Sequence, residues 1–530
     1  MNVIIAYDIG TTGVKTCLFG VDKTINLLGS ASMGYDLFLM PDGGAEQDQD
    51  QWWTSMCVTT AEVLKKTGVK METVEGMSFC SQMQGLVLVD KDGIPVHRPM
   101  SYMDQRARKE LQEGMQSGLR VQGLNVVNLV RSMMLTGAAS TSVKDPVWKY
   151  NWIRNHEPEN FRRAYKWLDV KEYLIHRCTG NFIMTRDSAF STMVYDTRKG
   201  KEQWSPSICR AFGVDMEHLP KVIRSEEEAG RLHEKAAAEL GLPAGIPVFG
   251  GGGDASLIGV GAGACGMGQT HIYWGTSGWV ETVTDRRAVD VVSMAAAIVG
   301  AQNERFNYFA ELGAAGKCLE WVRDHLALDE IGIYLSKEDV CEGEESLYKS
   351  LYEYLSETVA KAEPGAKGVI FTPWLHGNRC PFEDPNAAGM FFNLRLDTGK
   401  TEMIRAVIEG ICYHMRWMLQ VSDKKVRTSQ VIRFVGGGAL SEVTCQILAD
   451  ITGRTIETVP EPQNAGSVGA AAITCLGLGI IHDLDELQTM IPVVKTFEPN
   501  PETRDVYDRN YAVFQSLYDD NRKNFAALNS

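Results

Sequence analysis

A short pattern occurs twice in this chain, at positions half its length apart. Residues 7–14 read YDIGTTGV and residues 272–279 read IYWGTSGW, so that the matching glycines Gly13 and Gly278 lie 265 positions apart in a chain of 530. Each copy has an apolar strand, a glycine- and hydroxyl-rich turn and a second apolar strand. Glycines let backbone N–H groups approach an oxyanion closely, so each turn is suited to phosphate. Two such turns predict two related domains that close on one nucleotide.

The length and the order of elements support this division. A chain of 530 residues exceeds the size at which a single core keeps growing. Strands alternate with helices in both halves, which is typical of the α/β class. We therefore expect domains at residues 1–250 and 251–530, the second ending in a charged helical arm. The expected strands are 3–8, 14–21, 27–36, 74–79 and 85–89, and the expected helices are 46–67, 146–155, 171–179, 255–264, 313–328, 344–362, 401–421, 442–453 and 502–525.

Composition narrows the partners. A net charge of −14 argues against nucleic acid or an anionic membrane as the main partner. It is compatible with a nucleotide, because local donors and a divalent cation set the field at a phosphate site. The twelve cysteines form no C-x-x-C pair, which argues against a zinc site or disulfide scaffold. With no signal-peptide pattern and no long apolar run, the sequence predicts a cytoplasmic protein.

An acid precedes the first turn. Asp8 ends the apolar strand two residues before Gly10. A carboxylate there could bind Mg²⁺, directly or through water, and the metal would bridge nucleotide phosphates. The alternative is an aspartate that only caps the turn. Lys15, further along the hairpin, either reaches phosphate or is solvated.

A second acid follows four consecutive glycines. Asp254 comes directly after residues 250–253 and opens an apolar segment of small residues. An aspartate at a helix start is often a cap. Between a glycine loop and the second phosphate turn, it is also placed to act as a general base, which would take the proton of a substrate hydroxyl as that oxygen attacks the γ-phosphorus.

Three further glycine motifs differ in how strongly they indicate a nucleotide-binding site. Residues 261–266 read GAGACG, but a strand follows them where a dinucleotide fingerprint requires a helix. The Gly316-Lys317 pair has Glu311 where a P-loop requires its first glycine, so this is not a P-loop protein. Residues 434–441, FVGGGALS, read as a strand, a triple glycine and a helix start. A flat purine can lie against such a backbone, which favours an adenosine site over an ordinary tight turn.

Polar and aromatic residues gather in three tracts, at residues 82–85, 102–106 and 148–152. Convergent amide, carboxylate and aromatic groups suit a polyhydroxylated ligand, since each sugar hydroxyl both donates and accepts. The alternative is a structural role, which is the more natural one for the two tryptophans at helical spacing, Trp148 and Trp152.

Taken together, the motifs resemble the FGGY family of carbohydrate kinases, and its xylulose-phosphorylating members most closely. The resemblance spans nearly the whole chain. The motifs that carry it are DIGTTGVK at 8–15, EQD at 46–48, QMQG at 82–85, Asp104 with Arg106, HEPE at 156–159, GGGD at 251–254, GTSG at 275–278, GNRCP at 377–381, DPNAAG at 384–389, GGA at 437–439 and LAD at 448–450.

The resemblance implies an actin-like (ribonuclease H-like) duplicated ATPase fold, with two domains around a central cleft. It implies ATP and Mg²⁺ as cofactors, Asp254 as catalytic base, and Asp8 as a catalytic, metal-linked acid. The nucleotide-binding residues it implies are Gly10, Thr11, Thr12, Lys15, Gly275, Thr276, Gly316, Gly437, Gly438 and Ala439. The substrate-binding residues are Gln82, Met83, Gln84, Asp104, Arg106 and Asp254.

Several positions depart from the family pattern. Gln84 stands where the xylulose-phosphorylating members typically have His, Ala255 where they have Asn, and Tyr102-Met103 where they have Trp-Asn; Asn378 and Ala388 replace a Glu and an Arg. The first three changes lie near the expected sugar pocket, where an unpaired buried hydroxyl costs about 1–3 kcal/mol. The sequence thus predicts a kinase of a ketose such as D-xylulose. The alternatives are another pentulose, a hexulose, a polyol or a sugar acid, and, in a different class, an actin- or chaperone-like ATPase without a sugar. Homodimer formation is left open.

Overall fold

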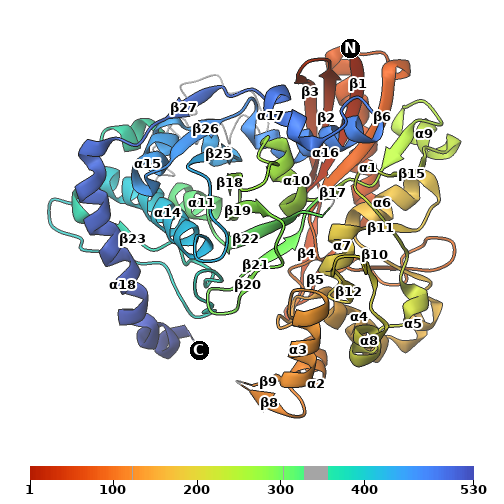
Figure 1. The fold of residues 1–530 in the computed structure, drawn as a ribbon, viewed down its shortest axis with the longest axis horizontal. Helices are drawn as coiled ribbons and strands as arrows, with labels where there is room; N and C mark the ends of the chain where they lie inside the picture. The colour runs from red at the N-terminus through yellow and green to blue at the C-terminus, as the bar shows by residue number, and fades with distance from the viewer. Residues whose placement is uncertain (122, 303, 327–355, 530) are drawn as a thin grey trace.

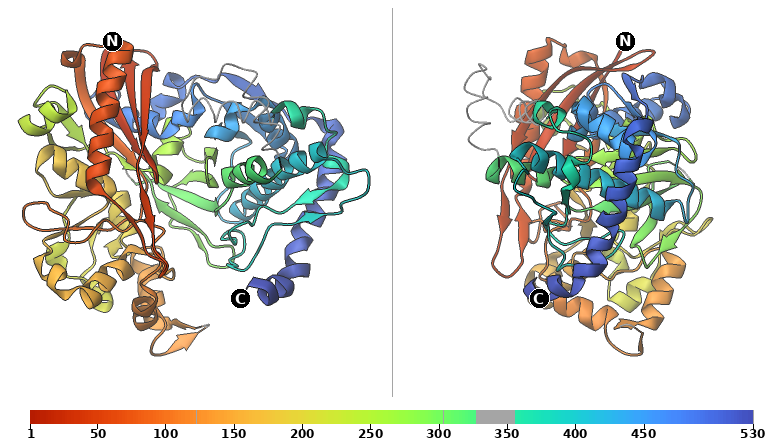
Figure 2. Two further views of the ribbon diagram at one scale, coloured as in Figure 1. Left: turned by 180° about the vertical axis from the view of Figure 1, so that it is seen from behind. Right: turned by 90° about the vertical axis from the view of Figure 1, so that its left-hand side faces the viewer.

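The computed structural model describes residues 1–121, 123–302, 304–326 and 356–529. Two mixed β-sheets lie side by side, with helices α10 (Asp254–Gly261) and α16 (Ala465–Gly477) between them (Figure 1). Both sheets carry helices on their outer sides, as the predicted α/β class requires. The view from behind in Figure 2 shows α1 (Gln49–Thr67) lying along the first sheet.

The first sheet has seven strands in the order β15-β16-β6-β1-β2-β3, with β17 paired to β6. Its strands are β1 (Asn2–Ile9), β2 (Gly13–Val21), β3 (Ile25–Gly34), β6 (Val74–Ser81), β15 (Glu228–Arg231), β16 (Pro247–Phe249) and β17 (Gly252–Gly253). The helices of this half are α1, α2 (Arg108–Met115), α3 (Val126–Leu135), α4 (Pro146–His156), α5 (Pro158–Arg163), α6 (Val170–Thr179), α7 (Arg186–Ser191), α8 (Pro206–Phe212) and α9 (Glu234–Leu240).

The second sheet has eight strands in the order β20-β21-β22-β19-β18-β25-β26-β27. Its strands are β18 (Thr270–Trp274), β19 (Gly278–Thr284), β20 (Val289–Asp290), β21 (Ala295–Val299), β22 (Phe306–Leu312), β25 (Val431–Val435), β26 (Thr455–Thr458) and β27 (Lys495–Phe497). The helices of this half are α10, α11 (Gly316–His325), α14 (Lys400–Ser422), α15 (Glu442–Thr452), α16, α17 (Leu487–Met490) and α18 (Arg504–Asn529).

Short strand pairs lie outside the two sheets. They are β4 (Leu37–Leu39) with β5 (Ala45–Gln47), β7 (Val87–Val89) with β10 (Lys166–Leu168), β8 (Arg120–Val121) with β9 (Leu124–Asn125), β11 (Ile183–Thr185) with β14 (Lys221–Ile223), β12 (Tyr195–Asp196) with β13 (Gln203–Trp204), and β23 (Ile370–Phe371) with β24 (Phe391–Phe392).

The two sheets repeat one topology. In the first, β3-β2-β1 is an antiparallel meander, and β6 and β16 continue it in parallel. In the second, β22-β19-β18 is the antiparallel meander, and β25 and β26 continue it in parallel. The repeated sequence pattern forms the first hairpin of each meander, so the predicted duplication is confirmed.

Helix α1 illustrates how local sequence sets a boundary. The Asp48 side chain accepts the N–H of Asp50, and Gly68 ends the helix in the left-handed region at φ 66°. The apolar side chains of Trp52 and Met56 are buried. We expected this helix to begin at residue 46, but residues 45–47 pair with β4 instead, so the cap at Asp48 fixes the true start.

Helices α10 and α16, which lie between the two sheets, pack on each other through small residues. A Cβ added at Gly261 of α10 would lie 1.8 Å from the Ala465 carbonyl oxygen, and one at Gly469 of α16 would lie 2.2 Å from the Leu257 carbonyl oxygen. Glycine is therefore required at both positions for the helices to pack this closely. Apolar residues of both sheets share one cluster around these helices, including Ile4.

Some of the remaining predicted elements are present among the described residues, and one lies mostly outside them. The C-terminal arm is α18, which packs back on the body through Tyr507 and Phe514, both fully buried. The helix expected at 313–328 is α11, while most of the one expected at 344–362 lies outside the described residues. Among the described cysteines, ten of eleven are buried and all are free thiols. None of the helices that the structure describes is long and apolar enough to cross a membrane.

Candidate active site

The first hairpin is held in shape by side chains from neighbouring strands. Within the turn, the Gly10 N–H donates to the Gly13 carbonyl at 2.9 Å. The Tyr35 hydroxyl donates to the Gly10 carbonyl, and Gln47 Nε2 donates to the Thr11 carbonyl at 2.5 Å. Two carbonyls of the turn are thus anchored by side chains that the pattern itself does not contain.

Asp8 lies where β1, β2 and β6 meet α16. It is opposite Lys15 on β2 and Cys80 on β6. A Cβ added at Gly466 would lie 2.9 Å from both Asp8 Oδ2 and Cys80 Sγ, so the carboxylate faces the start of α16. Burial raises the pKa of Asp8, while the Lys15 charge and the Cys80 hydrogen bond lower it.

Lys15 connects the two halves of the chain. Its Nζ donates to Asn464 Oδ1 at 2.9 Å, across 449 positions of sequence. Asn464 directly precedes α16 and is 1% exposed. The ammonium group is therefore anchored beside the first turn, on the side that faces the second half.

Asp254 is the first residue of α10, and its Oδ1 accepts the Ala255 N–H at 2.8 Å. Burial, together with the negative charges of Asp8 and Glu311, raises the pKa of Asp254 to about 7. Such a carboxyl can exchange a proton near neutral pH, which is what a general base needs. The structure thus shows the cap-like hydrogen bond of Asp254, while its role as general base stays a prediction.

The second hairpin is anchored by backbone groups. The Gly316 N–H donates to the Gly275 carbonyl at 2.9 Å, and the Lys317 N–H donates to the Thr276 carbonyl at 3.2 Å. A Cβ at Gly316 would lie 2.4 Å from the Gly275 carbonyl oxygen, so only glycine permits α11 to begin here. The structure therefore brings together Gly275, Thr276 and Gly316, which are far apart in the sequence.

The triple glycine packs against the same hairpin. Gly436 has φ +91°, and a Cβ there would lie 2.5 Å from the Trp274 carbonyl oxygen. A Cβ at Gly438 would lie 2.7 Å from Cγ of the Trp274 ring. Gly437, Gly438 and Ala439 form a buried 3₁₀ turn before α15. Close packing on Trp274 thus explains on structural grounds why glycine is needed at positions 436 and 438.

The tract at residues 82–85 lies between the first hairpin and Asp254. Gln82 Nε2 donates to Gln47 Oε1 at 2.9 Å, and the Gln82 N–H donates to the Ile9 carbonyl at 2.8 Å. A Cβ added at Gly253 would lie 2.1 Å from Met83 Cγ, so Met83 contacts the residue before Asp254. Gln84 has a left-handed backbone, with φ 63°. The Gln82 amide thus supports the hairpin, and Met83 lies beside the second acid.

Asp104 and Arg106 form a buried ion pair. Arg106 Nη2 donates to Asp104 Oδ2 and to Glu46 Oε1, both at 2.7 Å, and Asp104 Oδ2 also accepts the Ala45 N–H at 2.9 Å. The Arg106 guanidinium lies 4.3 Å from the centre of the Trp152 ring. Trp148 packs against Phe212 in the core. In this structure, Asp104 and Arg106 bind protein partners and brace the strand that carries Gln47.

Three buried ionisable residues at the site were not singled out from the sequence, although one of them, Lys149, lies within the tract at residues 148–152. Asp187 Oδ2 accepts the Gly253 N–H at 2.7 Å. Although burial opposes its ionisation, Lys171 and the surrounding hydrogen bonds hold the pKa of Asp187 below its usual value. Lys149 and Asp169 contact the tract at residues 82–85. The available signal was charge in apolar surroundings, such as Lys149 between Trp148 and Tyr150.

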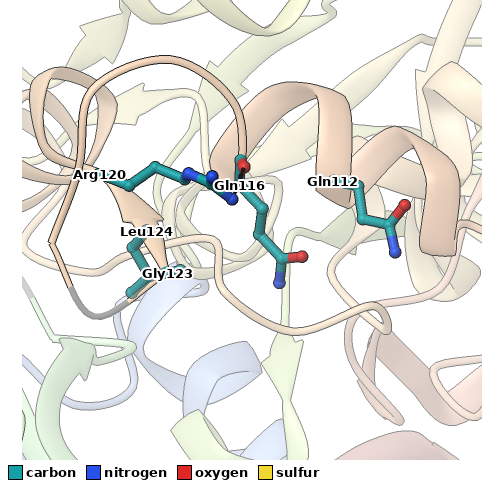
Figure 3. A pocket seen from close by; sticks show the side chains of 5 residues that line it. All are labelled: Gln112, Gln116, Arg120, Gly123 and Leu124. Atoms are coloured by element: carbon teal, nitrogen blue, oxygen red, sulfur yellow. Dashed lines mark hydrogen bonds between the residues drawn. The ribbon is translucent and has the colours of Figure 1, made fainter.

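A cavity of about 460 Å³ lies away from these residues. It is lined by Gln112, Gln116, Arg120, Gly123 and Leu124, around α2 and β9 at the lower end of the molecule in Figure 1 (Figure 3). None of the predicted site residues borders it, so the site is defined by the hairpins and the two acids and not by this cavity.

Comparison with known proteins places this geometry in a family. Residues 3–261 match the N-terminal domain and residues 271–478 the C-terminal domain of the FGGY family of carbohydrate kinases. The chain is 27% identical to a xylulose kinase of Staphylococcus epidermidis, over 98% of this chain and 96% of that protein. It is 25% identical to a gluconokinase of Bacillus subtilis, over 97% and 95%.

The solved structure of ligand-bound xylulose kinase from Lactobacillus acidophilus has the same fold. Its TM-score is 0.83 at 23% identity, and all of both chains is covered. This likeness confirms the predicted actin-like, two-domain architecture. Because the two family domains together match most of the sequence in the predicted order, the chain belongs to the FGGY family of carbohydrate kinases.

Proposed function

We propose that this kinase transfers the γ-phosphoryl group of ATP to a hydroxyl of a ketose such as D-xylulose, giving D-xylulose 5-phosphate. The observation that carries the proposal is the position and the pKa of Asp254. This carboxyl follows a glycine loop, and its pKa of about 7 is raised in part by the negative charge of Asp8. A sugar acid is the second candidate, since gluconokinases are among the relatives. Another pentulose, a hexulose or a polyol is the remaining alternative.

The reaction needs one proton acceptor and an aligned phosphate. Asp254 takes the proton of the sugar hydroxyl while that oxygen forms a bond to the γ-phosphorus. The bond between the γ-phosphorus and the β–γ bridging oxygen breaks, and ADP leaves with the electron pair. Met83 and Gln84, together with the Asp104–Arg106 pair and Gln82 behind them, form the sugar side of the site.

The nucleotide side would be formed by both hairpins. Gly10, Thr11, Thr12 and Lys15 meet the phosphates from the first half (residues 1–250). From the second half (residues 251–530), Gly275, Thr276 and Gly316 meet the phosphates, and Gly437, Gly438 and Ala439 border the adenosine. A cytoplasmic location and a homodimer stay predictions.

Asp8 is the residue that would hold Mg²⁺. The ion is usually bound in kinases by one or two carboxylates together with the substrate phosphates. The described residues contain no group of three or more His, Cys, Asp or Glu side chains that could form a complete metal site. A single half-buried carboxylate near Asp254 fits an ion that arrives with the nucleotide. When bound, Mg²⁺ would neutralise phosphate charge.

The test is a screen for sugar-dependent ADP release. Purified enzyme with Mg²⁺ and ATP is given D-xylulose, other pentuloses, hexuloses, polyols and gluconate, one at a time. We expect ADP release to depend on a ketose, with D-xylulose among the best substrates. Preference for gluconate would favour the sugar-acid alternative. ATP hydrolysis of equal rate with and without every sugar would instead support an actin- or chaperone-like ATPase.

A further inference from the structure

One peptide group at the sugar side of the site is held at both of its ends by buried ionisable side chains. The Gln84 carbonyl accepts from Lys149 Nζ at 2.7 Å, and the Gly85 N–H of the same peptide donates to Asp169 Oδ1 at 3.0 Å. Lys149 is 0% exposed and Asp169 is 5% exposed. Hydrogen bonds to charged partners are short and directional. Together they fix the plane of this peptide.

Lys149 also holds a second loop. Its Nζ donates to the Ser101 carbonyl at 2.8 Å, and Ser101 directly precedes Tyr102. Leu86 and Met100 exchange two backbone hydrogen bonds, of 2.9 and 3.0 Å, so the loops run beside one another. A single ammonium group on α4 therefore ties together the loop that carries Gln84 and the loop that carries Tyr102.

The clamped turn has a conformation that needs support. Gln84 has φ 63°, which is uncommon and strained for a residue with a side chain. A Cβ at Gly85 would lie 2.6 Å from Asp169 Oδ1, so the neighbouring position has no room for a side chain. The bonds to Lys149 and Asp169 supply the constraint that keeps the turn in this form.

Both loops reach the reacting side of the site. Met83, next to Gln84, contacts Gly253 beside Asp254. The Tyr102 side chain hydrogen-bonds with Thr11 of the first hairpin. It lies close enough to Asp254 for that negative charge to raise the pKa of Tyr102. Gln84 and Tyr102 are also two of the positions at which this chain departs from the family pattern. The orientation of the two clamped peptides therefore determines which protein groups face the acceptor sugar.

We propose that Lys149, assisted by Asp169, is a positioning residue that sets the acceptor-sugar pocket by fixing the peptides after Gln84 and Ser101. The inference rests on the proposed function, because it assigns these loops to the sugar. It assigns no part in phosphoryl transfer to Lys149, so substitution should alter sugar binding more than nucleotide binding.

The charge of Lys149 gives the clamp a pH dependence. Burial lowers the pKa of Lys149 to about 8. The charged groups that face it are Asp104, Asp169 and Asp145, which raise its pKa, and Lys144, which lowers it. The ammonium is therefore charged at neutral pH and loses its proton as the pH rises through 8. We expect the KM for the sugar to rise above this pH.

The experiment compares three variants of the full enzyme with the best sugar of the screen. Lys149→Met keeps the length of the side chain and removes its donors. We expect at least a tenfold higher KM for the sugar, with the KM for ATP within twofold of wild type. Lys149→Arg keeps a permanent charge, so it should recover most of the sugar affinity and lose the rise above pH 8.

Lys166→Met is the matched control. Lys166 also donates to two backbone carbonyls, those of Glu217 and Leu219, but it lies on β10 outside the site. Its loss should leave the KM for the sugar within twofold of wild type. This separates the loss of a lysine that bonds carbonyls from the loss of Lys149 in particular.

Two results would overturn the inference. One is a Lys149→Met enzyme with the sugar KM of wild type; the other is an equal rise in the KM values for sugar and ATP. If circular dichroism shows that Lys149→Met does not fold, Asp169→Asn tests the other hydrogen bond of the same peptide. We expect this variant to have a severalfold higher KM for the sugar. An unchanged KM would contradict the inference. A wild-type enzyme that phosphorylates no sugar would instead overturn the proposed function, and the inference with it.

Discussion

The two phosphate hairpins have one topology and different chemistry. At matching positions, the first hairpin carries Asp8 and the second carries Tyr273. The Tyr273 ring packs against Trp279 at 4.1 Å between centres, and a Cβ at Gly275 would lie 2.0 Å from its hydroxyl. The duplicated hairpin thus provides two turns of one topology, and the acid proposed to hold Mg²⁺ occurs at the matching position of the first copy alone.

The supports of the two turns also differ. The first turn is held by the side chains of Tyr35 and Gln47 and also by the Tyr35 N–H, which donates to the Thr12 carbonyl at 2.9 Å, whereas backbone N–H groups of Gly316 and Lys317 hold the second. A turn held by side chains depends on residue identity at distant positions. A turn held by backbone depends on how α11 begins. The two halves therefore stabilise turns of the same shape through different kinds of hydrogen bond.

The comparison predicts its largest effect at Asp254, which supplies the acid that the second hairpin lacks. Asp254→Asn has the same shape but cannot accept the proton, so we expect kcat to fall by about 10²–10⁴. Nucleotide affinity, measured by calorimetry, should stay near that of wild type. Asp285→Asn, an exposed aspartate at the end of β19, is the control. A near-normal kcat for Asp254→Asn would remove it as the base.

The next prediction tests the asymmetry directly. Asp8→Asn should lower activity about 100-fold, since losing a group that orients a metal costs about 10–100-fold, and should raise the Mg²⁺ concentration needed for half-maximal rate. Tyr273→Phe keeps the ring on Trp279 and should change kcat by less than threefold. Steady-state rates over a Mg²⁺ titration measure both. Equal losses in the two variants would mean that the hairpins share the chemistry.

The sequence allowed the duplication and both acids to be predicted, because each depends on local pattern. Glycines in a turn and an acid at a strand end have the same meaning wherever the chain folds. The boundaries of the predicted helices that the structure describes were within four residues, with α1 expected three residues too early, because residues 45–47 pair with another strand, and α18 expected to end four residues too early. Strand pairing is a tertiary event that a helical pattern does not record.

The clamp on the Gln84–Gly85 peptide could not be predicted in this way. Nothing in the spacing of Lys149 tells which carbonyls its ammonium reaches, since its partners lie 65 and 48 positions away. The left-handed backbone of Gln84 is equally hidden, because glycine would be the expected residue there. The tract was recognised as polar, but whether its polar groups face the ligand or brace the protein depends on packing.

A third prediction concerns the contact between α10 and α16, the two helices that lie between the sheets. Gly261→Ala places a methyl group where the Ala465 carbonyl oxygen lies, 1.8 Å from the ideal Cβ. We expect the free energy of unfolding to fall by about 1–3 kcal/mol, the usual cost of overpacking, as measured by urea denaturation. Gly313→Ala is the control, because a Cβ there meets no atom within 4 Å. Equal stability of the two variants would show that the helices separate without cost.

The smallest predicted effect is a shift in the pH profile, and it links the second sheet to Asp254 through charge. Asp254 must be ionised to accept a proton, so kcat/KM should fall as the pH drops below about 7, its pKa. Glu311 lies on β22 of the second sheet, and its negative charge raises that pKa. Glu311→Gln removes this charge, which makes proton loss from Asp254 easier.

The acidic limb of the Glu311→Gln profile should therefore move to lower pH, and the variant should keep more of its maximal activity at pH 6 than wild type does. Glu442→Gln provides the control, since Glu442 is an exposed glutamate paired with Lys495 on the far side of the second sheet. A limb that stays in place, or moves to higher pH, would mean that Glu311 of the second sheet does not tune the base. In that case the pKa of Asp254 would be set by its burial and by Asp8, without a contribution from the second sheet.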